Sequence, residues 1–561
     1  MAIYEKFIGR SRDSFVSLKD CQENFKITYE QDFNFAYDVI DVLGTEKPDK
    51  LALLYVSNEQ EEKRFTFGDM KRLSDKAANY FVSEGVKKGD PVLLILKRSY
   101  LFWVITLALN KIGAIMVPAS NMLKGKDYVY RCNKAKIKYA VITGDDNCTE
   151  YFDDRKDEYE TIEKKFVTKH KAAPGWIDFE EGFEKASEDW TRPTGDAATT
   201  VDDTMIINFS SGTTGYPKII AHDFKYPLGH IMTGVFWHRV VDGGMHFTVS
   251  DSGWAKSLWG KYYGQWMGET ANFVYDFDKF DGADILSKLE KYHITTFCVP
   301  PTMYRLMLQN DVSKYDLSSI THCCTAGEAL NADIFNKWKE ATGLEIHEGF
   351  GMSETPVSIC TLYPWTKPVP GAIGFPAPGL KVHILDEEGN HCQRGTIGEI
   401  CIKAESPEEH PCGVVASYNF SEEDTAEAYR GGFFHTGDLA YRDEQGRFVY
   451  FGRNDDVIKS SGYRIGPFEI ESVMLEHPSV LEVAVTGVPD PVRGFVVKAT
   501  VVLRPGFEGS PELVKELQTY VKTNTAPYKY PRIIEFVDEL PKTFSGKVRR
   551  VEIRQNDSNK Q

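Results

Sequence analysis

The feature that most limits the possible folds of this chain is an alternation of short apolar runs with amphipathic helical stretches. The run KLALLYV (50–56) is followed by a helical stretch that begins near Thr66 and ends before Gly85, and then by the run DPVLLIL (90–96). Strands connected by crossover helices lie parallel in one sheet. The alternation therefore predicts an α/β fold in which these runs are parallel strands covered by helices.

Further along the chain, the alternation of apolar runs and helical stretches continues and is then replaced by another pattern. The runs 139–144, 293–300 and 318–324 are additional strand candidates, whereas short segments rich in glycine and β-branched residues follow residue 370 and predict a β subdomain. A chain of 561 residues is too long for one ordinary core. We expect a large N-terminal domain with parallel or mixed sheets, helices and a β subdomain, and a small mobile C-terminal α+β domain. The expected boundaries are 1–453 for the large domain, 454–461 for a polar hinge and 462–561 for the small domain.

Charge and cysteine usage narrow the classes of partner. The 66 Lys and Arg residues against 82 Asp and Glu residues give a formal charge of -16, which opposes broad binding to nucleic acid or to an anionic membrane. Ten cysteines without a CxxC pair are typical of reduced thiols in a cytoplasm. The start of the chain is charged, and the apolar stretch 101–122 is interrupted by Lys111 and Pro118. We therefore expect small-molecule partners, no membrane span and a cytoplasmic location.

The segment SSGTTGYPK (210–218) combines glycines, hydroxyls and one lysine between two apolar runs. Such a loop can turn successive N–H groups toward a phosphate, with the hydroxyls and the lysine adding contacts. It is not the GxxxxGK[ST] loop, because Tyr216 and Pro217 separate Gly215 from Lys218. A surface linker rich in turn-forming residues is the alternative.

Four other segments carry weaker signals. Glu354 in EGFGMSET (348–355) could hold Mg²⁺ or cap a helix. Asp438 in FHTGDL could accept from two ribose hydroxyls or belong to an ordinary turn. TAGEAL (325–330) follows an apolar strand, where open α/β sheets bind ligands. Lys547 in LPKTFSGKVRR could deliver a charge to an anionic centre or belong to a basic, solvated tail.

Taken together, the segments SSGTTGYPK, TAGEAL, GFGMSET, HTGD, GRNDDVIKSSGYRI and PKTFSGK, in this order, resemble the acyl-adenylate-forming (AMP-forming) acyl-CoA synthetase superfamily. The resemblance covers residues from about 30 to about 552 and is closest to medium-chain acyl-CoA synthetases. It implies ATP, Mg²⁺ and coenzyme A as cofactor and co-substrates, and a carboxylic acid as the small-molecule substrate. A homodimer is compatible with it.

The resemblance also implies roles for particular residues. The catalytic residues would be Lys547, Lys218 and Glu354, and Glu354 would also ligate Mg²⁺. Asp455 would be the hinge residue, and the coenzyme A contacts would be Ser461, Gly462 and Arg464. The ATP contacts would be Ser210, Ser211, Gly212, Thr213, Thr214, Gly215, Lys218, Gly327, Glu328, Ala329, Gly349, Phe350, Ser353, Asp438 and Arg453.

The acid is less well defined. Acetyl-CoA synthetases place tryptophan at the position of Gly351, so glycine there implies a longer acyl pocket, for which Trp237, Trp259 and Cys298 are the other candidates. We expect a saturated acid beyond acetate, short to medium in chain length, with branched acids such as 2-methylbutyrate allowed. An aryl-acid ligase acting on benzoate-like acids is the alternative enzyme. A nucleotide-regulated protein that binds an acyl ligand without turnover is the alternative outside enzymes.

Overall fold

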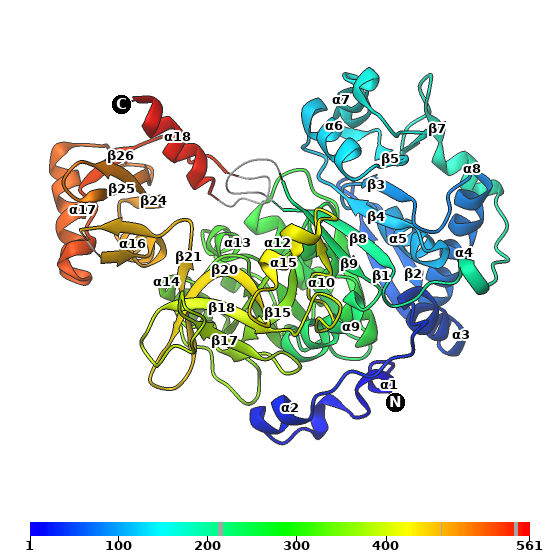
Figure 1. The fold of residues 1–561 in the computed structure, drawn as a ribbon, viewed down its shortest axis with the longest axis horizontal. Coiled ribbons are helices and arrows are strands. Elements are labelled where there is room, and N and C mark those ends of the chain that lie inside the picture. The colour runs from blue at the N-terminus through cyan, green and yellow to red at the C-terminus, as the bar shows by residue number, and fades with distance from the viewer. Residues whose placement is uncertain (211–216, 462, 543–547, 561) are drawn as a thin grey trace.

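The computed structural model describes residues 1–210, 217–461, 463–542 and 548–560. In Figure 1 the chain forms a large body and a smaller unit beside it. The large body holds the N-terminal and central segments, and the smaller unit, in orange and red, holds the chain from β22 (Ile458–Ser460) onward. This arrangement confirms the expected α/β class with a large N-terminal domain and a small C-terminal α+β domain.

Among the described residues, one sheet of the large domain has eight strands in the order β19-β9-β8-β4-β3-β5-β6-β7. The strands from β8 to β7 are parallel. At the other end of the sheet, β9 pairs antiparallel with β8, and β19 pairs antiparallel with β9. Their bounds are β3 (Pro91–Ile95), β4 (Ile115–Pro118), β5 (Tyr139–Thr143), β6 (Lys164–Thr168), β7 (Ile177–Asp178), β8 (Thr204–Phe209), β9 (Ile219–Asp223) and β19 (Ser417–Tyr418).

A second sheet has nine strands within the same described ranges, in the order β16-β15-β14-β13-β12-β10-β11-β1-β2. The strands from β14 to β1 are parallel. At one end β2 pairs antiparallel with β1; at the other end β15 pairs antiparallel with β14, and β16 pairs antiparallel with β15. Their bounds are β1 (Leu51–Val56), β2 (Glu62–Thr66), β10 (Met245–Thr248), β11 (Ala271–Tyr275), β12 (Thr296–Cys298), β13 (His322–Ala326), β14 (Ile346–Met352), β15 (Thr355–Cys360) and β16 (Phe375–Pro376).

One expectation about pairing is wrong. The first two apolar runs are strands, but β1 belongs to the nine-stranded sheet and β3 to the eight-stranded sheet. β1 instead pairs with β2, its neighbour in sequence, and with β11, more than 200 residues later. Alternating hydrophobicity identifies a strand, but it does not carry the identity of the partner strand.

The helices of the large domain cover these two sheets (Figure 1). α4 begins and ends as expected: Thr66 and Asp69 form a capping box, and Gly85 follows with a φ of 100°. Within the described ranges, no helix has the length and apolar character needed to cross a membrane. The helices are α1 (Glu5–Ile8), α2 (Leu18–Asn24), α3 (Val42–Glu46), α4 (Phe67–Ser83), α5 (Leu101–Ile112), α6 (Gly125–Lys134), α7 (Cys148–Asp153), α8 (Phe179–Lys185), α9 (Tyr226–Ile231), α10 (Ala255–Gly260), α11 (Tyr263–Met267), α12 (Gly282–Lys291), α13 (Pro301–Met307), α14 (Ala332–Thr342) and α15 (Glu422–Ala428).

The glycine-rich part of the chain after residue 370 forms the expected β subdomain. It is an antiparallel sheet in the order β17-β18-β20-β21, and its apolar core also includes Ile220 of β9 and Ile359 of β15. The bounds are β17 (Val382–Leu385), β18 (Gly398–Lys403), β20 (Phe433–Arg442) and β21 (Phe448–Arg453).

The small domain has a separate core built from one sheet and its helices. β22 pairs with β23 and β25, although residues 458–460 fall within the segment expected to be a hinge. The stretch 454–457 is thus the part of the expected hinge that joins β21 to the small sheet. The other elements are β23 (Tyr463–Ile465), β24 (Val480–Asp490), β25 (Gly494–Leu503), β26 (Ile533–Phe536), α16 (Pro467–Leu475), α17 (Pro511–Asn524) and α18 (Arg550–Lys560).

Candidate functional site

The two ends of the expected phosphate loop are joined by hydrogen bonds. β8 and β9 are antiparallel, with Phe209 opposite Ile219. The Ser210 N–H donates to the Lys218 carbonyl oxygen at 3.0 Å, and the Lys218 N–H donates to Ser210 Oγ at 3.2 Å. The other residues of this prediction lie outside the described residues, namely Ser211, Gly212, Thr213, Thr214 and Gly215.

Tyr418 connects Lys218 with Glu354. It lies on β19, which pairs with β9, and the Lys218 Nζ atom lies 5.8 Å from the centre of its ring. The Tyr418 hydroxyl acts on the carboxylate of Glu354 and lowers its pKa; Glu354 is 8% exposed and stands between β14 and β15. The structure thus brings two predicted residues to one tyrosine that the sequence did not single out. Only the pairing of β19 with β9, distant in sequence, could have revealed it.

Asp438 and Arg453 lie opposite each other on two adjacent strands of the β subdomain. They are register partners on β20 and β21, and the Tyr450 hydroxyl donates to Asp438 Oδ1 at 2.7 Å. Burial alone would lower the pKa of Arg453, but the carboxylates of Asp438 and Asp455 raise it well above its usual range. Arg453 Nε donates to Asp455 Oδ1 at 3.2 Å. The guanidinium therefore remains charged between the two carboxylates.

The charges of Asp438 and Arg453 also change the pKa of Glu354. Burial raises the pKa of Glu354; the Tyr418 hydroxyl and the Arg453 guanidinium oppose that rise, and the Asp438 carboxylate adds to it. A buried carboxylate whose charge is only partly compensated is a good oxygen donor for a hard divalent cation, which would relieve the cost of burial. The donor at this position therefore fits Mg²⁺.

Phe350 and Ser353 adjoin the same group. The Phe350 ring, on β14, lies 6.2 Å from the Tyr450 ring. The carbonyl oxygen of Ser353 accepts from Nε2 of His222 at 2.8 Å. Burial lowers the pKa of His222 to about 4, so its imidazole is neutral near pH 7. His222 was missed from the sequence, where its only signal is a polar side chain near the end of a buried strand.

The segment Gly327–Ala329 follows the carboxyl end of β13. Ala326 is the register partner of Gly349 on β14, so this segment starts beside the strand that carries Phe350. Thr302 Oγ1 donates to Glu328 Oε2 at 2.8 Å. Lys256, for which the sequence suggested no role, donates from Nζ to the Ala326 carbonyl oxygen at 3.0 Å. These contacts fix the end of β13 against α10 and α13.

The expected acyl-pocket residues are partly brought together. The Trp237 and Trp259 rings lie 6.1 Å apart, and Trp237 is fully buried. A Cβ atom added at Gly349 would lie 2.6 Å from the Trp237 ring, so glycine there lets β14 approach the indole. Cys298 is the register partner of Cys324, whose Sγ donates to the Trp237 carbonyl oxygen at 3.3 Å.

Gly351 has a structural role of its own. A Cβ atom at this position would lie 2.8 Å from the Pro356 carbonyl oxygen and 3.3 Å from Val357 Cα. A larger side chain would therefore first collide with the backbone of β15. The expectation that Gly351 lengthens the acyl pocket stays a prediction.

Two of the three expected coenzyme A residues, Ser461 and Arg464, are described, and Arg464 lies at the junction of the two domains. The Ser461 N–H donates to the Arg493 carbonyl oxygen at 2.9 Å. Arg464 Nη1 donates to Glu387 Oε1 at 2.8 Å, which links the small domain to the β subdomain. Gly462 lies outside the described residues.

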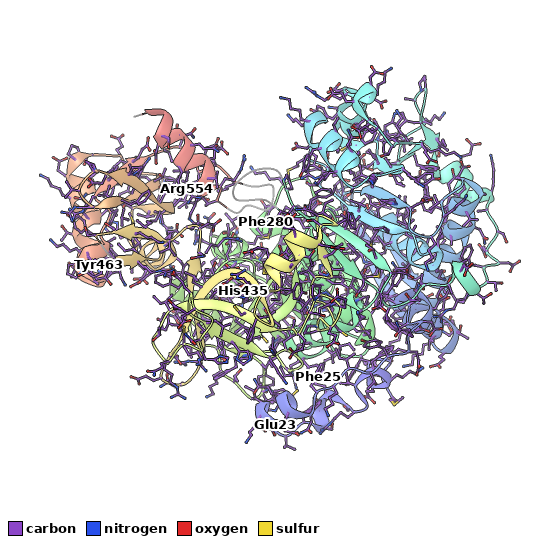
Figure 2. The ribbon with its side chains drawn as sticks, viewed as in Figure 1. Glu23, Phe25, Phe280, His435, Tyr463 and Arg554 are labelled. Atoms are coloured by element: carbon purple, nitrogen blue, oxygen red, sulfur yellow. The ribbon has the colours of Figure 1, made fainter. Side chains whose placement is uncertain are left out.

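Lys547 also lies outside the described residues, but its flanks are in place. Lys542 and Val548 form an antiparallel bridge, and α18 follows. Arg554 on α18, labelled in Figure 2, donates to Asp456 Oδ1 at 2.7 Å. The helix after Lys547 is thus ion-paired to the expected hinge.

Comparison with known proteins identifies two family models in this chain. The model described as AMP-binding enzyme matches residues 42–407, and the model described as AMP-binding enzyme C-terminal domain matches residues 469–547. Rat acyl-coenzyme A synthetase ACSM3, mitochondrial, is 39% identical, and the match covers 99% of this chain and 96% of the relative. Mouse acyl-coenzyme A synthetase ACSM5, mitochondrial, is 40% identical over 94% of this chain and 91% of the relative.

Solved structures give the same result for the fold. The anthranilate CoA ligase AuaEII in complex with anthranoyl-AMP has a TM-score of 0.84 at 27% identity, covering 95% of this chain and 98% of that one. A benzoate CoA ligase from Burkholderia xenovorans LB400 has a TM-score of 0.79 at 26% identity, covering 93% and 100%. The relatives named above are mitochondrial by name, so the expected cytoplasmic location stays a prediction, as does a homodimer.

Proposed function

We propose that this chain, which belongs to the AMP-binding enzyme family and is an AMP-forming acyl-CoA synthetase, performs both half-reactions at the residues gathered around Glu354. The enzyme uses ATP, Mg²⁺ and coenzyme A. In the first half-reaction a carboxylate oxygen attacks the α-phosphorus of ATP and pyrophosphate leaves. In the second, the coenzyme A thiol attacks the acyl carbonyl of acyl-AMP, and AMP leaves with the bonding electron pair.

The nucleotide would lie across the carboxyl ends of β13 and β14. Asp438 and Arg453 would bind the ribose hydroxyls, because both are polar groups presented by adjacent strands of the β subdomain. Ser353 would contact the α-phosphate. The phosphates and the adenine would be held by two sets of residues, Ser210 to Gly215 with Lys218 for the phosphates, and Gly327, Glu328, Ala329, Gly349 and Phe350 for the adenine.

Charge compensation is the main task of the first half-reaction, because a carboxylate must approach a polyanion. Lys218 would supply positive charge at the phosphates, and Lys547 would do so at the attacking carboxylate and the α-phosphate. Glu354 would hold Mg²⁺, which when bound neutralises phosphate charge.

The second half-reaction needs access to the same carbonyl by a thiol. We propose that rotation about Asp455 withdraws Lys547 and presents Ser461, Gly462 and Arg464 to coenzyme A. The Arg464–Glu387 ion pair would be exchanged for a contact with a nucleotide phosphate, a better bidentate partner for a guanidinium.

The observation that carries this proposal is the convergence on Glu354. Tyr418 contacts both Lys218 and Glu354, and the charges of Arg453 and Asp438 act on the same carboxylate. These five residues come from five separate segments of the sequence. A group built from one basic, two acidic and one guanidinium side chain suits a magnesium nucleotide.

For the acid, we propose a saturated chain longer than acetate, up to medium length, with branching allowed. The relatives named as ACSM proteins support a medium-chain class, and the paired indoles of Trp237 and Trp259 support a wide, apolar slot. The observation that favours an aryl acid instead is the resemblance to anthranilate and benzoate CoA ligases.

A substrate panel tests the function and separates these alternatives. Acetate, butyrate, 2-methylbutyrate, octanoate, benzoate and anthranilate would be supplied with ATP and Mg²⁺, and pyrophosphate and AMP would be counted separately. We expect acid-dependent pyrophosphate release for butyrate to octanoate, and AMP release once coenzyme A is added. Preference for benzoate would establish the aryl-acid alternative, and ATP binding without pyrophosphate release for any acid would contradict the proposal.

A further inference from the structure

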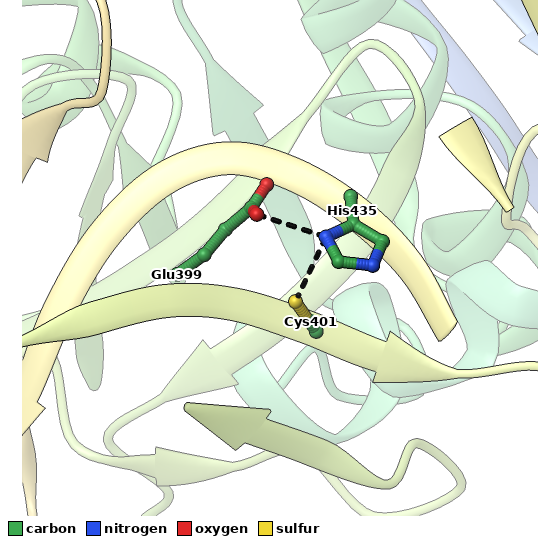
Figure 3. Close-up of side chains that lie close together, drawn as sticks. All are labelled: Glu399, Cys401 and His435. Atoms are coloured by element: carbon green, nitrogen blue, oxygen red, sulfur yellow. Dashed lines mark hydrogen bonds and ion pairs between the residues drawn. The ribbon is translucent and has the colours of Figure 1, made fainter. Parts of the chain in front are cut away.

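Three side chains of the β subdomain lie close together although no role has been assigned to them. Glu399 and Cys401 lie on β18, and His435 lies opposite Cys401 on β20 (Figure 3). His435 Nδ1 is 2.8 Å from Glu399 Oε2 and 3.5 Å from Cys401 Sγ. A carboxylate, a thiol and an imidazole in contact could hold a metal ion or form a hydrogen-bonded support, and their other contacts distinguish the two.

The hydrogen bonds of Glu399 and His435 favour a support. Glu399 Oε1 accepts from the Gly437 N–H at 2.9 Å, and its Oε2 accepts from His435 Nδ1. His435 Nε2 lies 3.3 Å from the Arg430 carbonyl oxygen, another acceptor. Both ring nitrogens thus face acceptors, and both carboxylate oxygens face donors. A metal ion at this place would have to displace these bonds.

The support acts on the stretch of β20 that carries Asp438. Gly437 has a φ of 74°, and its N–H, bound by Glu399, immediately precedes Asp438. On the same stretch of β20, Thr436 Oγ1 donates to the Ile400 carbonyl oxygen at 2.7 Å and accepts from the Asp438 N–H at 3.2 Å.

The same stretch of β20 also contacts the expected hinge. The Gly437 carbonyl oxygen accepts from the N–H of Asn454 at 2.9 Å. The N–H and the carbonyl oxygen of Gly437, which belong to two successive peptide units, therefore join the Glu399 carboxylate to the first residue after β21. Displacing Gly437 would move the Asp438 carboxylate together with the start of the hinge.

We propose that Glu399 is a positioning residue for nucleotide binding: with His435 holding its second oxygen, its carboxylate fixes the Gly437 peptide so that Asp438 meets the ribose. This inference rests on the ribose role proposed for Asp438. Replacing Glu399 with Gln weakens the contact, because a glutamine has one acceptor oxygen for three donors, the Gly437 N–H, His435 Nδ1 and Arg430 Nη2, and its NH₂ group would face an N–H. The chain offers a matched control in Glu427, an exposed glutamate that contacts the same Arg430.

The test compares ATP with 2′-deoxy-ATP and 3′-deoxy-ATP in the adenylation half-reaction of the full chain. A hydrogen bond to a charged group contributes enough that removing one ribose hydroxyl should lower kcat/KM of the unaltered enzyme about 10- to 100-fold. In Glu399→Gln we expect kcat/KM for ATP to fall about 10-fold, the penalty for the deoxy analogues to shrink to under about 3-fold, and KM for the acid to stay unchanged. Glu427→Gln should behave as the unaltered enzyme. A general loss of structure would lower all rates together without changing the ratio between ATP and its deoxy analogues.

Three outcomes overturn the inference. Full discrimination against both deoxy analogues in Glu399→Gln removes the positioning role. If that variant does not fold, His435→Gln serves instead, and we expect a smaller loss of the same discrimination; unchanged discrimination there also refutes the inference. One equivalent of zinc in the purified enzyme that is absent from Glu399→Gln would make the cluster a metal site. Asp438→Ala separates this inference from its premise, because discrimination retained in that variant would contradict the ribose role itself.

Discussion

Glu348 is a buried carboxylate next to Gly349, and its surroundings lead to a quantitative prediction. The side chain lies on β14 and is 6% exposed, and its Oε1 accepts from the Leu330 N–H at 3.1 Å. Burial raises its pKa from 4.5 to about 8, although the Leu330 N–H opposes the rise. The folded chain therefore binds this proton more tightly than the unfolded chain does. The resulting stability is fully present below pH 4.5 and is lost as the pH rises through 8.

The size of the effect follows from these two values. Each tenfold change in proton affinity corresponds to about 1.4 kcal/mol, so the full difference is roughly 5 kcal/mol at most. Relaxation around the charged group reduces it, and we expect about 2 to 5 kcal/mol above pH 8. Glu348→Gln stays neutral and keeps an oxygen for the Leu330 N–H. The variant should equal the unaltered enzyme near pH 4.5 and be more stable by a margin that grows up to pH 8.

The assay is the difference in thermal midpoint between variant and unaltered enzyme, measured at intervals from pH 5 to 9. Glu340→Gln on the exposed side of α14 is the control and should show no pH-dependent difference. A difference for Glu348→Gln that is independent of pH would refute the reasoning. So would a variant that is less stable than the unaltered enzyme above pH 8.

Two further predictions concern packing. Gly349→Ala places a Cβ atom 2.6 Å from the Trp237 ring. We expect a loss of about 1 to 3 kcal/mol in stability and a shift of kcat/KM toward shorter acids. An unchanged preference among acids would show that Trp237 does not line the acyl pocket. Arg550→Met removes a guanidinium that binds both oxygens of Glu471 at 2.7 Å, so the amides of the small sheet should lose about 3 kcal/mol of protection in hydrogen exchange. Arg549→Met, which breaks only an exposed pair with Glu552, is its control and should lose almost none.

Local structure followed closely from the sequence. The start of α4 was predictable because Thr66 and Asp69 satisfy each other's backbone N–H groups without help from the rest of the fold. The β subdomain was predictable from the glycine and β-branched texture of its short segments. Both features depend on residues close together in the chain.

Pairing over long distances was not predictable in the same way. β1 and β3 look alike in sequence but join different sheets, because strand partners are selected by packing of the whole domain. Tyr418 and His222 were missed for a related reason: they lie on β19 and β9 of the eight-stranded sheet, whereas Glu354 and Ser353 lie between two strands of the nine-stranded sheet, far away in sequence. The order of short motifs in the sequence was enough to identify the family. Tyr418 and His222, which lie outside those motifs, could be placed next to the site only with the fold.

The most direct test of the proposed mechanism measures both half-reactions separately in Lys547→Ala. Pyrophosphate release from acid and ATP reports the first, and thioester formation from supplied acyl-AMP and coenzyme A reports the second. We predict that the variant loses about 100-fold or more of the first rate, because a charge is missing where the transition state needs it, and keeps most of the second. Equal rates of pyrophosphate release in the variant and the unaltered enzyme would contradict the account.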